Sequence, residues 1–204
     1  MKMRAAVLTA TETPKPYAVS RPVEIAEVDL EPPGEGEALV EMRAAGVCHS
    51  DLSIINGSRP RPLPMVLGHE AAGVVAEVGR GVKSLKTGDH VAFVFVPSCG
   101  HCEPCMSGRP ALCEPGAKAN LNGTLLGGGR RLSWRGENVN HQVGVSCFAE
   151  YAVASENSLI KVDQTLPIDE ASLFSCAVIT GVGAVLNAAR MPSGATAAIV
   201  GCGG

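Results

Sequence analysis

Short apolar runs separated by glycine and proline dominate the hydrophobic pattern of this 204-residue chain. In several runs apolar and polar residues alternate, which is the pattern of strands with one buried face. The dense turn-forming residues between the runs favour short strands over long helices. The pattern therefore predicts a mainly β fold with strands at Met3–Thr9, Val23–Leu30, Glu37–Ala45, Gly73–Val78, His90–Val96 and Phe148–Ala154.

Two segments carry helical signals. Ser50–Ile55 follows a turn and predicts a short helix. Pro167 precedes Asp169 and Glu170, and acidic residues are favoured in the first turn of a helix, where the helix dipole stabilises negative charge. We therefore expect a longer helix that runs from this point to about Ala189.

The longer helix is uncharged from Ala171 to Ala189, which is the length of a membrane span. Serine, threonine, asparagine and glycine make the segment too polar for an isolated span and favour a buried helix. The N-terminus lacks the sustained apolar core of a signal peptide. We therefore expect a soluble, cytoplasmic protein with no membrane partner.

The remaining segments complete the predicted organisation. Residues 114–140 are rich in glycine, asparagine and arginine and predict a long surface loop. Ala195–Val200 is a run of small apolar residues that predicts a strand leading into glycines. Strand patterning gives way to helix between Asp163 and Asp169, so we expect two domains, 1–165 and 166–204.

Composition narrows the classes of function. The formal net charge is −3 and aromatic residues make up 3% of the chain. A nearly balanced charge with so few aromatic side chains excludes a nucleic-acid partner of the usual basic or stacking kind. Eight cysteines without a secretory signal favour metal binding or catalysis over disulfides.

Four of the cysteines crowd into one glycine- and proline-rich segment: Cys99, Cys102, Cys105 and Cys113. Four thiolates on such a loop can surround one zinc ion tetrahedrally, and a site with four cysteine ligands has no open position. This spacing therefore predicts a structural zinc site. Disulfides, an iron–sulfur cluster and free thiols are the alternatives.

Two further clusters, Cys48–Asp51 and Gly68–Glu70, suggest a second metal site. Cys48 and His69 are possible zinc ligands, and Cys176 is a distant third. Two cysteines and one histidine form a ligand set that leaves a fourth position for water or substrate. Asp51 is of the right type to accept the second ring N–H of such a histidine. A hydrogen-bonded His69 and an ordinary buried Cys176 thiol are the alternatives.

Taken together, these clusters resemble the medium-chain zinc-dependent alcohol dehydrogenases, in the branch of alcohol and S-(hydroxymethyl)glutathione dehydrogenases. The resemblance covers the whole chain and is carried, in order, by Met3–Thr9, Gly46–Asp51, Gly68–Val75, Gly88–Val91, the four-cysteine segment, Phe148–Tyr151 and Cys176–Gly181. It implies a GroES-like, partly open β-barrel catalytic domain in residues 1–165. A helix and the first strand of a truncated Rossmann domain would follow in residues 166–204.

The resemblance also implies roles for individual residues. The catalytic zinc ligands would be Cys48, His69 and Cys176, and the structural zinc ligands Cys99, Cys102, Cys105 and Cys113. Residues beside the reacting atoms would be Ser50, which hydrogen-bonds the substrate oxygen, Asp51 behind His69, and Glu70 near the metal. Phe95 would line the substrate pocket, or merely fill the core. Cofactor contacts would come from His49, Thr180, Gly201 and Gly203.

The implied activity is hydride transfer between a small alcohol or aldehyde and NAD, with NADP left open, in a full-length protein that forms a homo-oligomer. Two zinc ions per chain are expected. Cys176 counts against the sorbitol and threonine dehydrogenase relatives, which do not use this third cysteine. Because the nucleotide-binding domain has barely begun at Gly204, we expect the chain alone to be inactive.

Two departures from the family pattern leave alternatives open. Ser53 stands where many members place a histidine that ends the proton relay. After Cys113 the nearest base is Lys118, whereas glutathione-dependent formaldehyde dehydrogenases carry an arginine there. S-(hydroxymethyl)glutathione oxidation therefore remains an alternative to oxidation of a simple alcohol. A non-catalytic zinc-binding module is the alternative from another class.

Overall fold

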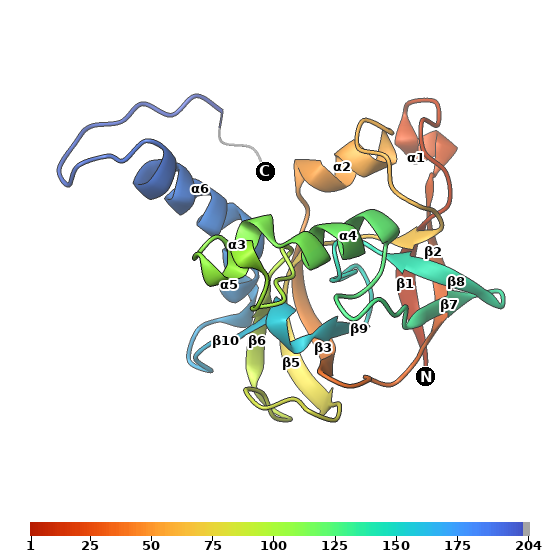
Figure 1. Ribbon diagram of the computed structural model, residues 1–204. Coiled ribbons are helices and arrows are strands. Elements are labelled where there is room, and N and C mark those ends of the chain that lie inside the picture. Colours follow the sequence, from red (N-terminus) through yellow and green to blue (C-terminus); the bar gives the residue numbers. More distant parts are fainter. Residues whose placement is uncertain (202–204) are drawn as a thin grey trace.

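The computed structural model describes residues 1–201 and contains a closed five-stranded barrel and a separate five-stranded sheet (Figure 1). The closed barrel runs in the order β1 (Lys2–Leu8), β2 (Val23–Leu30), β7 (Leu132–Trp134), β8 (Glu137–His141) and β4 (Met65–Val66). The second sheet runs in the order β10 (Leu159–Lys161), β6 (His90–Phe93), β5 (Glu70–Val78), β3 (Glu37–Gly46) and β9 (Tyr151–Ser155). A bridge between Ala5 and Ala149 links the two sheets.

The alternation of buried and exposed residues along the strands shows which face of each sheet packs against the core. In β2, Ala26, Val28 and Leu30 are buried while Glu27 and Asp29 are exposed, as expected for a strand with one wet face. The barrel interior is filled by a cluster of buried apolar side chains that includes Met3, Val7, Val28, Leu30, Leu132 and Val139. A second cluster of buried side chains packs on the five-stranded sheet and includes Phe93, Val40, Val75, Val91 and Ala154.

Short helices lie on the connections between strands. They are α1 (Tyr17–Ser20), α2 (His49–Ile55), α3 (Glu103–Met106), η1 (Pro110–Leu112), α4 (Glu114–Asn122) and η2 (Glu156–Ser158). The C-terminal helix is continuous over Ile168–Ala188 and comprises α5 (Ile168–Leu173), η3 (Phe174–Val178), α6 (Ile179–Gly183) and η4 (Ala184–Ala188), with π-helical turns in η3 and η4. The predicted mainly β fold, a strand at each of the six predicted positions and the short helix after Cys48 are confirmed. Two strands are shorter than predicted, because β6 ends at Phe93 rather than Val96 and β9 begins at Tyr151 rather than Phe148.

The long loop predicted at residues 114–140 is wrong. The Cys113 sulfur accepts a hydrogen bond from Gly116 N at 3.3 Å and starts α4, and Gly123 ends it with a left-handed φ of 65°. Strands β7 and β8 then form a hairpin across Arg135 and Gly136, whose φ angles of 55° and 83° suit a two-residue turn. These capping and turn residues were present in the sequence but were interpreted only as signs of a loop.

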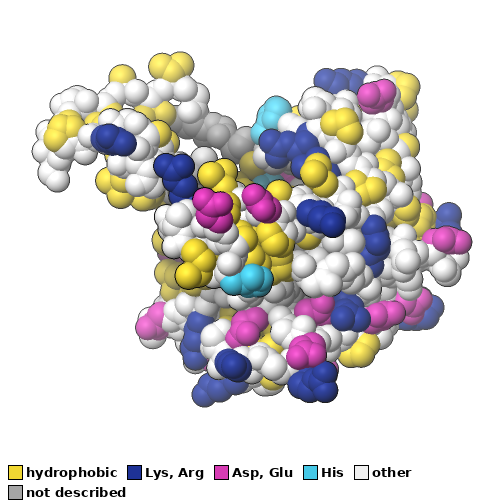
Figure 2. Space-filling view, in the orientation of Figure 1, with side chains coloured by type: hydrophobic (Ala, Val, Ile, Leu, Met, Phe, Trp, Pro, Cys, Tyr) yellow, Lys and Arg dark blue, Asp and Glu magenta, His cyan; other side chains and the backbone are white. Residues whose placement is uncertain are grey.

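The C-terminal helix is also not the buried helix that we predicted. It extends away from the five-stranded sheet (Figure 1), and its most apolar window is only 22% buried. Hydrophobic side chains therefore lie on its surface (Figure 2), among them Phe174, Val182 and Leu186. By length and composition alone, this helix could cross a membrane, although the core helix of a soluble protein meets the same criteria.

The strand predicted at Ala195–Val200 is not formed. This segment is exposed coil, because no strand among residues 1–201 lies beside it to complete a hydrogen-bonded ladder. Gly201 is exposed with a φ of 83°, and the predicted cofactor contact Gly203 lies outside the described residues. The proposed boundary between residues 165 and 166 stays a prediction.

Candidate functional site

Three segments that are far apart in the sequence meet at one point. Cys48 is the residue that caps the start of α2, His69 immediately precedes β5, and Cys176 lies in η3. The ligand atoms of these three side chains all lie within 4.8 Å of one another. The structure therefore brings together the three residues that the sequence had left scattered.

A buried hydrogen-bond network holds His69 in place. Asp51 Oδ1 lies 2.9 Å from His69 Nδ1, and Asp51 Oδ2 accepts the Cys48 backbone N–H at 3.0 Å. Gln142 Nε2 donates to the same Asp51 Oδ1 at 2.7 Å, while its Oε1 accepts the Gly68 N–H at 2.6 Å. With Nδ1 engaged by Asp51, Nε2 is the ring nitrogen left free to bind a metal.

Asp51, Cys48 and His69 shift one another's pKa values: those of Asp51 and Cys48 are lowered, and that of His69 is raised despite its burial. Burial opposes ionisation of Asp51, but hydrogen bonds from His69, Cys48 and Gln142 outweigh it and lower its pKa. Burial likewise raises the pKa of Cys48, but hydrogen bonds from Ser50 and His69 leave it below its ordinary value.

Cys176 shows the opposite shift. Burial, the neighbouring Cys48 thiolate and the Glu70 carboxylate together raise the pKa of Cys176 to about 11. A second thiolate is therefore unfavourable in this position unless a cation neutralises the charge. Two thiols that ionise fully only beside a cation, together with a neutral imidazole, are a donor set suited to zinc.

A cavity of about 260 Å³ opens on the three side chains. Ser50 and Thr180 line it with polar groups, and Phe95 forms part of its apolar wall. The Phe95 ring packs edge-on against His69 with 5.7 Å between ring centroids. The cavity thus joins a possible metal position to a space of the size of a small organic molecule.

Glu70, His49 and Ser53 are not among the residues that line this cavity, and each makes contacts of its own. The Glu70 carboxylate accepts the Ala177 backbone N–H at 3.1 Å, which ties the helix that carries Cys176 to β5. His49 is exposed in the first turn of α2. Ser53 donates to the His49 carbonyl at 3.1 Å and lies 3.4 Å from His49 Nδ1.

The four-cysteine segment forms a second closed group. The sulfurs of Cys99, Cys102, Cys105 and Cys113 lie within 4.8 Å of one another, with Cys102 and Cys105 at 3.4 Å. All cysteines among residues 1–201 are free, so the disulfide alternative finds no support there.

Backbone N–H groups point at the sulfurs of this group, as in sites that hold thiolates. Cys99 N donates to Cys113 Sγ at 3.2 Å, and Cys102 N donates to Cys99 Sγ at 3.3 Å. The His101 backbone N–H and further hydrogen bonds lower the pKa of Cys99 to about 6. Burial and its cysteine neighbours raise the pKa of Cys105 to about 12. Complete ionisation of the four thiols again requires a cation.

A family model for the alcohol dehydrogenase GroES-like domain matches residues 34–164, which include both cysteine- and histidine-rich regions except Cys176. The chain belongs to this family. The match identifies the β body as the GroES-like domain of the alcohol dehydrogenases, and it confirms the family resemblance and the fold class.

Curated relatives of this alcohol dehydrogenase domain are longer proteins. The chain is 43% identical over its whole length to a protein named alcohol dehydrogenase D from Mycobacterium tuberculosis. It is 41% identical to S-(hydroxymethyl)glutathione dehydrogenase from Escherichia coli. Because each match covers 53% of the relative, the chain spans about half the length of the curated relatives it matches.

Solved structures show the same fold. An alcohol dehydrogenase zinc-binding domain protein from Burkholderia ambifaria matches with a TM-score of 0.82 and 37% identity, over 92% of this chain and 49% of that one. Benzyl alcohol dehydrogenase from Acinetobacter calcoaceticus matches with a TM-score of 0.80 and 33% identity, over 92% of this chain and 48% of that one.

Three polar residues at the cavity of this GroES-like domain are not among those predicted from the sequence. Gln142, which holds both Asp51 and Gly68, lies in the segment after β8, where no local pattern marks it. Arg59 and Arg61 follow α2 and also line the cavity. Two closely spaced arginines within a proline-rich turn were a visible signal, but only the fold shows which surface they face.

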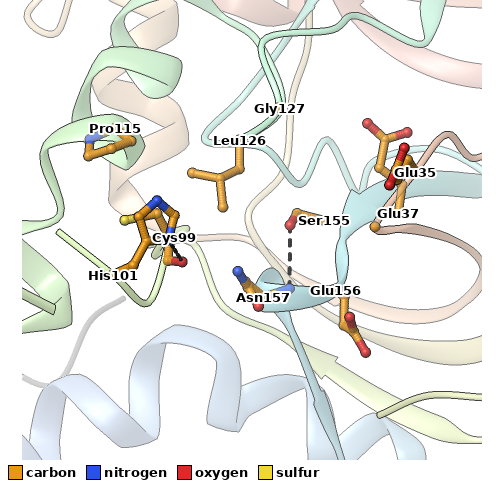
Figure 3. Close-up of a pocket in the computed structure, with 11 residues that line it drawn as sticks. Glu35, Glu37, Cys99, His101, Pro115, Leu126, Gly127, Ser155, Glu156 and Asn157 are labelled. Atoms are coloured by element: carbon orange, nitrogen blue, oxygen red, sulfur yellow. Dashed lines mark hydrogen bonds between the residues drawn. The ribbon is translucent and has the colours of Figure 1, made fainter. Parts of the chain in front are cut away.

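The domain has a second cavity, of about 370 Å³, beside the four-cysteine group (Figure 3). Its acidic side chains are already paired within the fold. Glu37 binds Arg131 Nε at 2.8 Å, Glu35 binds Arg80 at 2.8 Å, and Glu156 accepts from the Ser84 hydroxyl at 2.6 Å. His101 Nδ1 lies 2.7 Å from the Cys99 carbonyl oxygen and takes no part in the sulfur group. This cavity therefore offers no set of free groups for chemistry.

Proposed function

We propose that the protein to which this chain belongs is a zinc-dependent alcohol dehydrogenase that transfers hydride between an alcohol or aldehyde and NAD or NADP. This chain supplies the substrate side of the active site. The observation that carries the proposal is the convergence of Cys48, His69 and Cys176 at the wall of the cavity that also contains Ser50.

The residues present fit two zinc ions with different roles. Cys48, His69 and Cys176 would hold one ion and leave a ligand position facing the cavity, whereas Cys99, Cys102, Cys105 and Cys113 would enclose the other completely. A zinc ion in the open site supplies Lewis acidity, which polarises the oxygen of an alcohol or a carbonyl.

The chain's own residues position the substrate and move its proton. Ser50 lies in the first turn of α2 and lines the cavity, where its hydroxyl would pass on the hydroxyl proton of an alcohol. Ser53 donates to the His49 carbonyl and has no basic nitrogen, so the proton would leave through water or another group rather than through Ser53. Asp51 fixes the imidazole of His69 so that Nε2 points to the metal position.

Cofactor binding, location and assembly complete the proposal. Thr180 lines the cavity where a nicotinamide ring would approach, and His49 with Gly201 and Gly203 would contact the rest of the cofactor. Residues 166–204 would begin the nucleotide-binding domain, whose remainder would cover the exposed apolar face of the C-terminal helix. The complete protein would be a cytoplasmic homo-oligomer that binds neither nucleic acid nor membrane.

A matched pair of cysteine variants tests the proposal in the protein made from the complete reading frame. Cys176→Ala removes a ligand of the open site, whereas Cys147→Ala removes a buried free thiol that belongs to neither sulfur group. We expect Cys176→Ala to lose one zinc equivalent and alcohol-dependent NAD reduction, and Cys147→Ala to keep both. Retention of both zinc ions and full turnover by Cys176→Ala contradicts the proposal.

A second candidate function is oxidation of S-(hydroxymethyl)glutathione, which is the name of the relatives from Escherichia coli. The absence of an arginine directly after Cys113 weighs against it. A requirement for glutathione in formaldehyde oxidation would favour this candidate over a simple alcohol. The 204-residue chain alone should neither bind NAD tightly nor reduce it, and measurable alcohol-dependent reduction by that chain contradicts this expectation.

A further inference from the structure

Two arginines line the cavity that contains the open metal site. Arg59 and Arg61 lie on the chain between α2 and β4, and they share this cavity with Cys48, Ser50 and His69. Figure 2 shows Lys and Arg side chains gathered beside a histidine near the start of α2. Among the described residues, no carboxylate lines the cavity.

The Arg61 guanidinium is only partly satisfied by the protein. Its Nη1 donates to the Pro60 carbonyl at 2.8 Å, but its Nε is buried without a hydrogen-bond partner. Burial and the positive charge of Arg59 lower the pKa of Arg61. A buried N–H group without an acceptor is costly to a fold, so this position calls for an acceptor from outside the chain.

Neither arginine forms an ion pair within residues 1–201, although other arginines of the domain do. The acidic groups close to the cavity form hydrogen bonds with other partners. Asp51 binds His69 and Gln142, and Glu70 binds the Ala177 N–H. Arg59 and Arg61 are two like charges in one partly enclosed space whose lining holds no carboxylate, so they repel each other, and an anion placed between them removes that repulsion.

We propose that Arg59 and Arg61 bind an anionic group of the substrate, so that the protein acts on an alcohol or aldehyde that carries a carboxylate or a phosphate. The proposal rests on the proposed function of the same site. The free Nε–Nη2 edge of Arg61 has the planar fork that carboxylate and phosphate oxygens accept in pairs. Ile54, Phe95 and Val143 supply an apolar wall for the body of the molecule.

The test compares three primary alcohols with the zinc-loaded protein made from the complete reading frame: benzyl alcohol, 4-(hydroxymethyl)benzoate and 4-(hydroxymethyl)phenyl phosphate. We expect kcat/KM for one or both anionic alcohols to exceed that for benzyl alcohol by about ten- to a hundredfold, the effect of one charge-assisted hydrogen-bonded pair. The better anion then distinguishes carboxylate from phosphate as the natural group.

Variants identify the residues responsible. Arg61→Gln and Arg59→Gln should each reduce the ratio of anionic to neutral kcat/KM by about tenfold or more, and Arg61→Lys should restore part of it. Arg109→Gln changes an exposed arginine of the four-cysteine segment and should leave the ratio unchanged. Inhibition by benzoate gives a second readout, because its inhibition constant should rise in Arg61→Gln and stay constant in Arg109→Gln.

The outcomes separate this inference from the proposed function. Turnover of benzyl alcohol with no preference for either anionic alcohol overturns the inference and leaves the dehydrogenase proposal intact. An anionic preference that survives both glutamine substitutions also overturns it. No turnover of any alcohol by the zinc-loaded protein overturns the proposed function, and the inference falls with it. If Arg61→Gln fails to fold, the exposed Arg59→Gln still decides the matter.

Discussion

Replacing Gln142 with leucine removes the amide that joins Gly68 to Asp51 behind His69. Gln142 is 2% exposed; its side-chain amide accepts from the Gly68 N–H at 2.6 Å and donates to Asp51 Oδ1 at 2.7 Å. Leucine has nearly the same size, so the change removes polar contacts without opening a large cavity. The Gly68 N–H is left buried without a partner, and the Asp51 carboxylate loses one of its donors.

These two losses set the expected magnitude. An unsatisfied buried donor costs about 1–3 kcal/mol, and a hydrogen bond to a charged group contributes about 1.5–3 kcal/mol, so we expect a total loss of about 2.5–6 kcal/mol. Since Gln142 also orients a ligand through Asp51, zinc affinity at the open site should fall by about ten- to a hundredfold.

Urea unfolding of the zinc-loaded chain measures the first effect, and competition with a chromophoric chelator measures the second. With an m value of about 2–3 kcal/mol per molar urea, the midpoint should fall by about 1–3 M. Gln164→Leu is the matched control, because Gln164 is exposed and donates only to the Gly88 carbonyl. A Gln142→Leu midpoint equal to that of the control, with unchanged zinc affinity, would falsify the reasoning.

Three further predictions concern the second metal site, an ion pair and the core. Cys105→Ser should remove the more chelator-resistant zinc equivalent, as measured by elemental analysis after dialysis, whereas loss of the open-site zinc instead refutes the assignment. Lys161 Nζ lies 2.7 Å from Asp89 Oδ1 and, with other contacts, lowers the pKa of Asp89. The ionised Asp89 carboxylate therefore stabilises the fold above pH 3.8, its ordinary pKa, and this stabilisation is lost as the pH falls through the lowered pKa. Melting curves should thus show Asp89→Asn less stable than the parent at pH 7, with the gap closing below about pH 3.8; a constant gap contradicts this. Phe93→Ala should cost about 3–5 kcal/mol in denaturant unfolding, because Phe93 is fully buried, and a loss under 1 kcal/mol, roughly that of a surface change, refutes its place in the core.

Local patterns in the sequence were enough to predict much of the body of this domain. Alternation predicted β2 because one of its faces is exposed to solvent, and the turn before Ser50–Ile55 predicted the short helix α2. Both signals act between residues close in sequence, so a single chain reveals them. The spacing of the four cysteines worked in the same way.

The failures involve contacts that form only in three dimensions, or signals that were given too little weight. Uncharged composition predicted burial of the C-terminal helix, but burial needs a second surface, and the described residues provide one only for its first turns. Gln142 donates a hydrogen bond to Asp51, which is far away in the sequence, and no residue next to Gln142 predicts that contact. The residues that cap α4 and form the β7–β8 turn are visible in the sequence, but composition outweighed them and led to the wrong prediction of a loop.

The separation of Cys48, His69 and Cys176 along the chain has a consequence for chain entropy. An ion that binds all three closes a very long loop, whereas an ion in the four-cysteine group closes a short one. By the polymer model for covalent cross-links, closing a 100-residue loop stabilises a fold by about 4.7 kcal/mol at 25 °C, against about 3 kcal/mol for 15 residues. A metal ion in the open site would therefore also cross-link the barrel to the helix that carries Cys176. Removal of its metal should release that helix first, and amide hydrogen exchange along η3 would accelerate before exchange in the barrel strands.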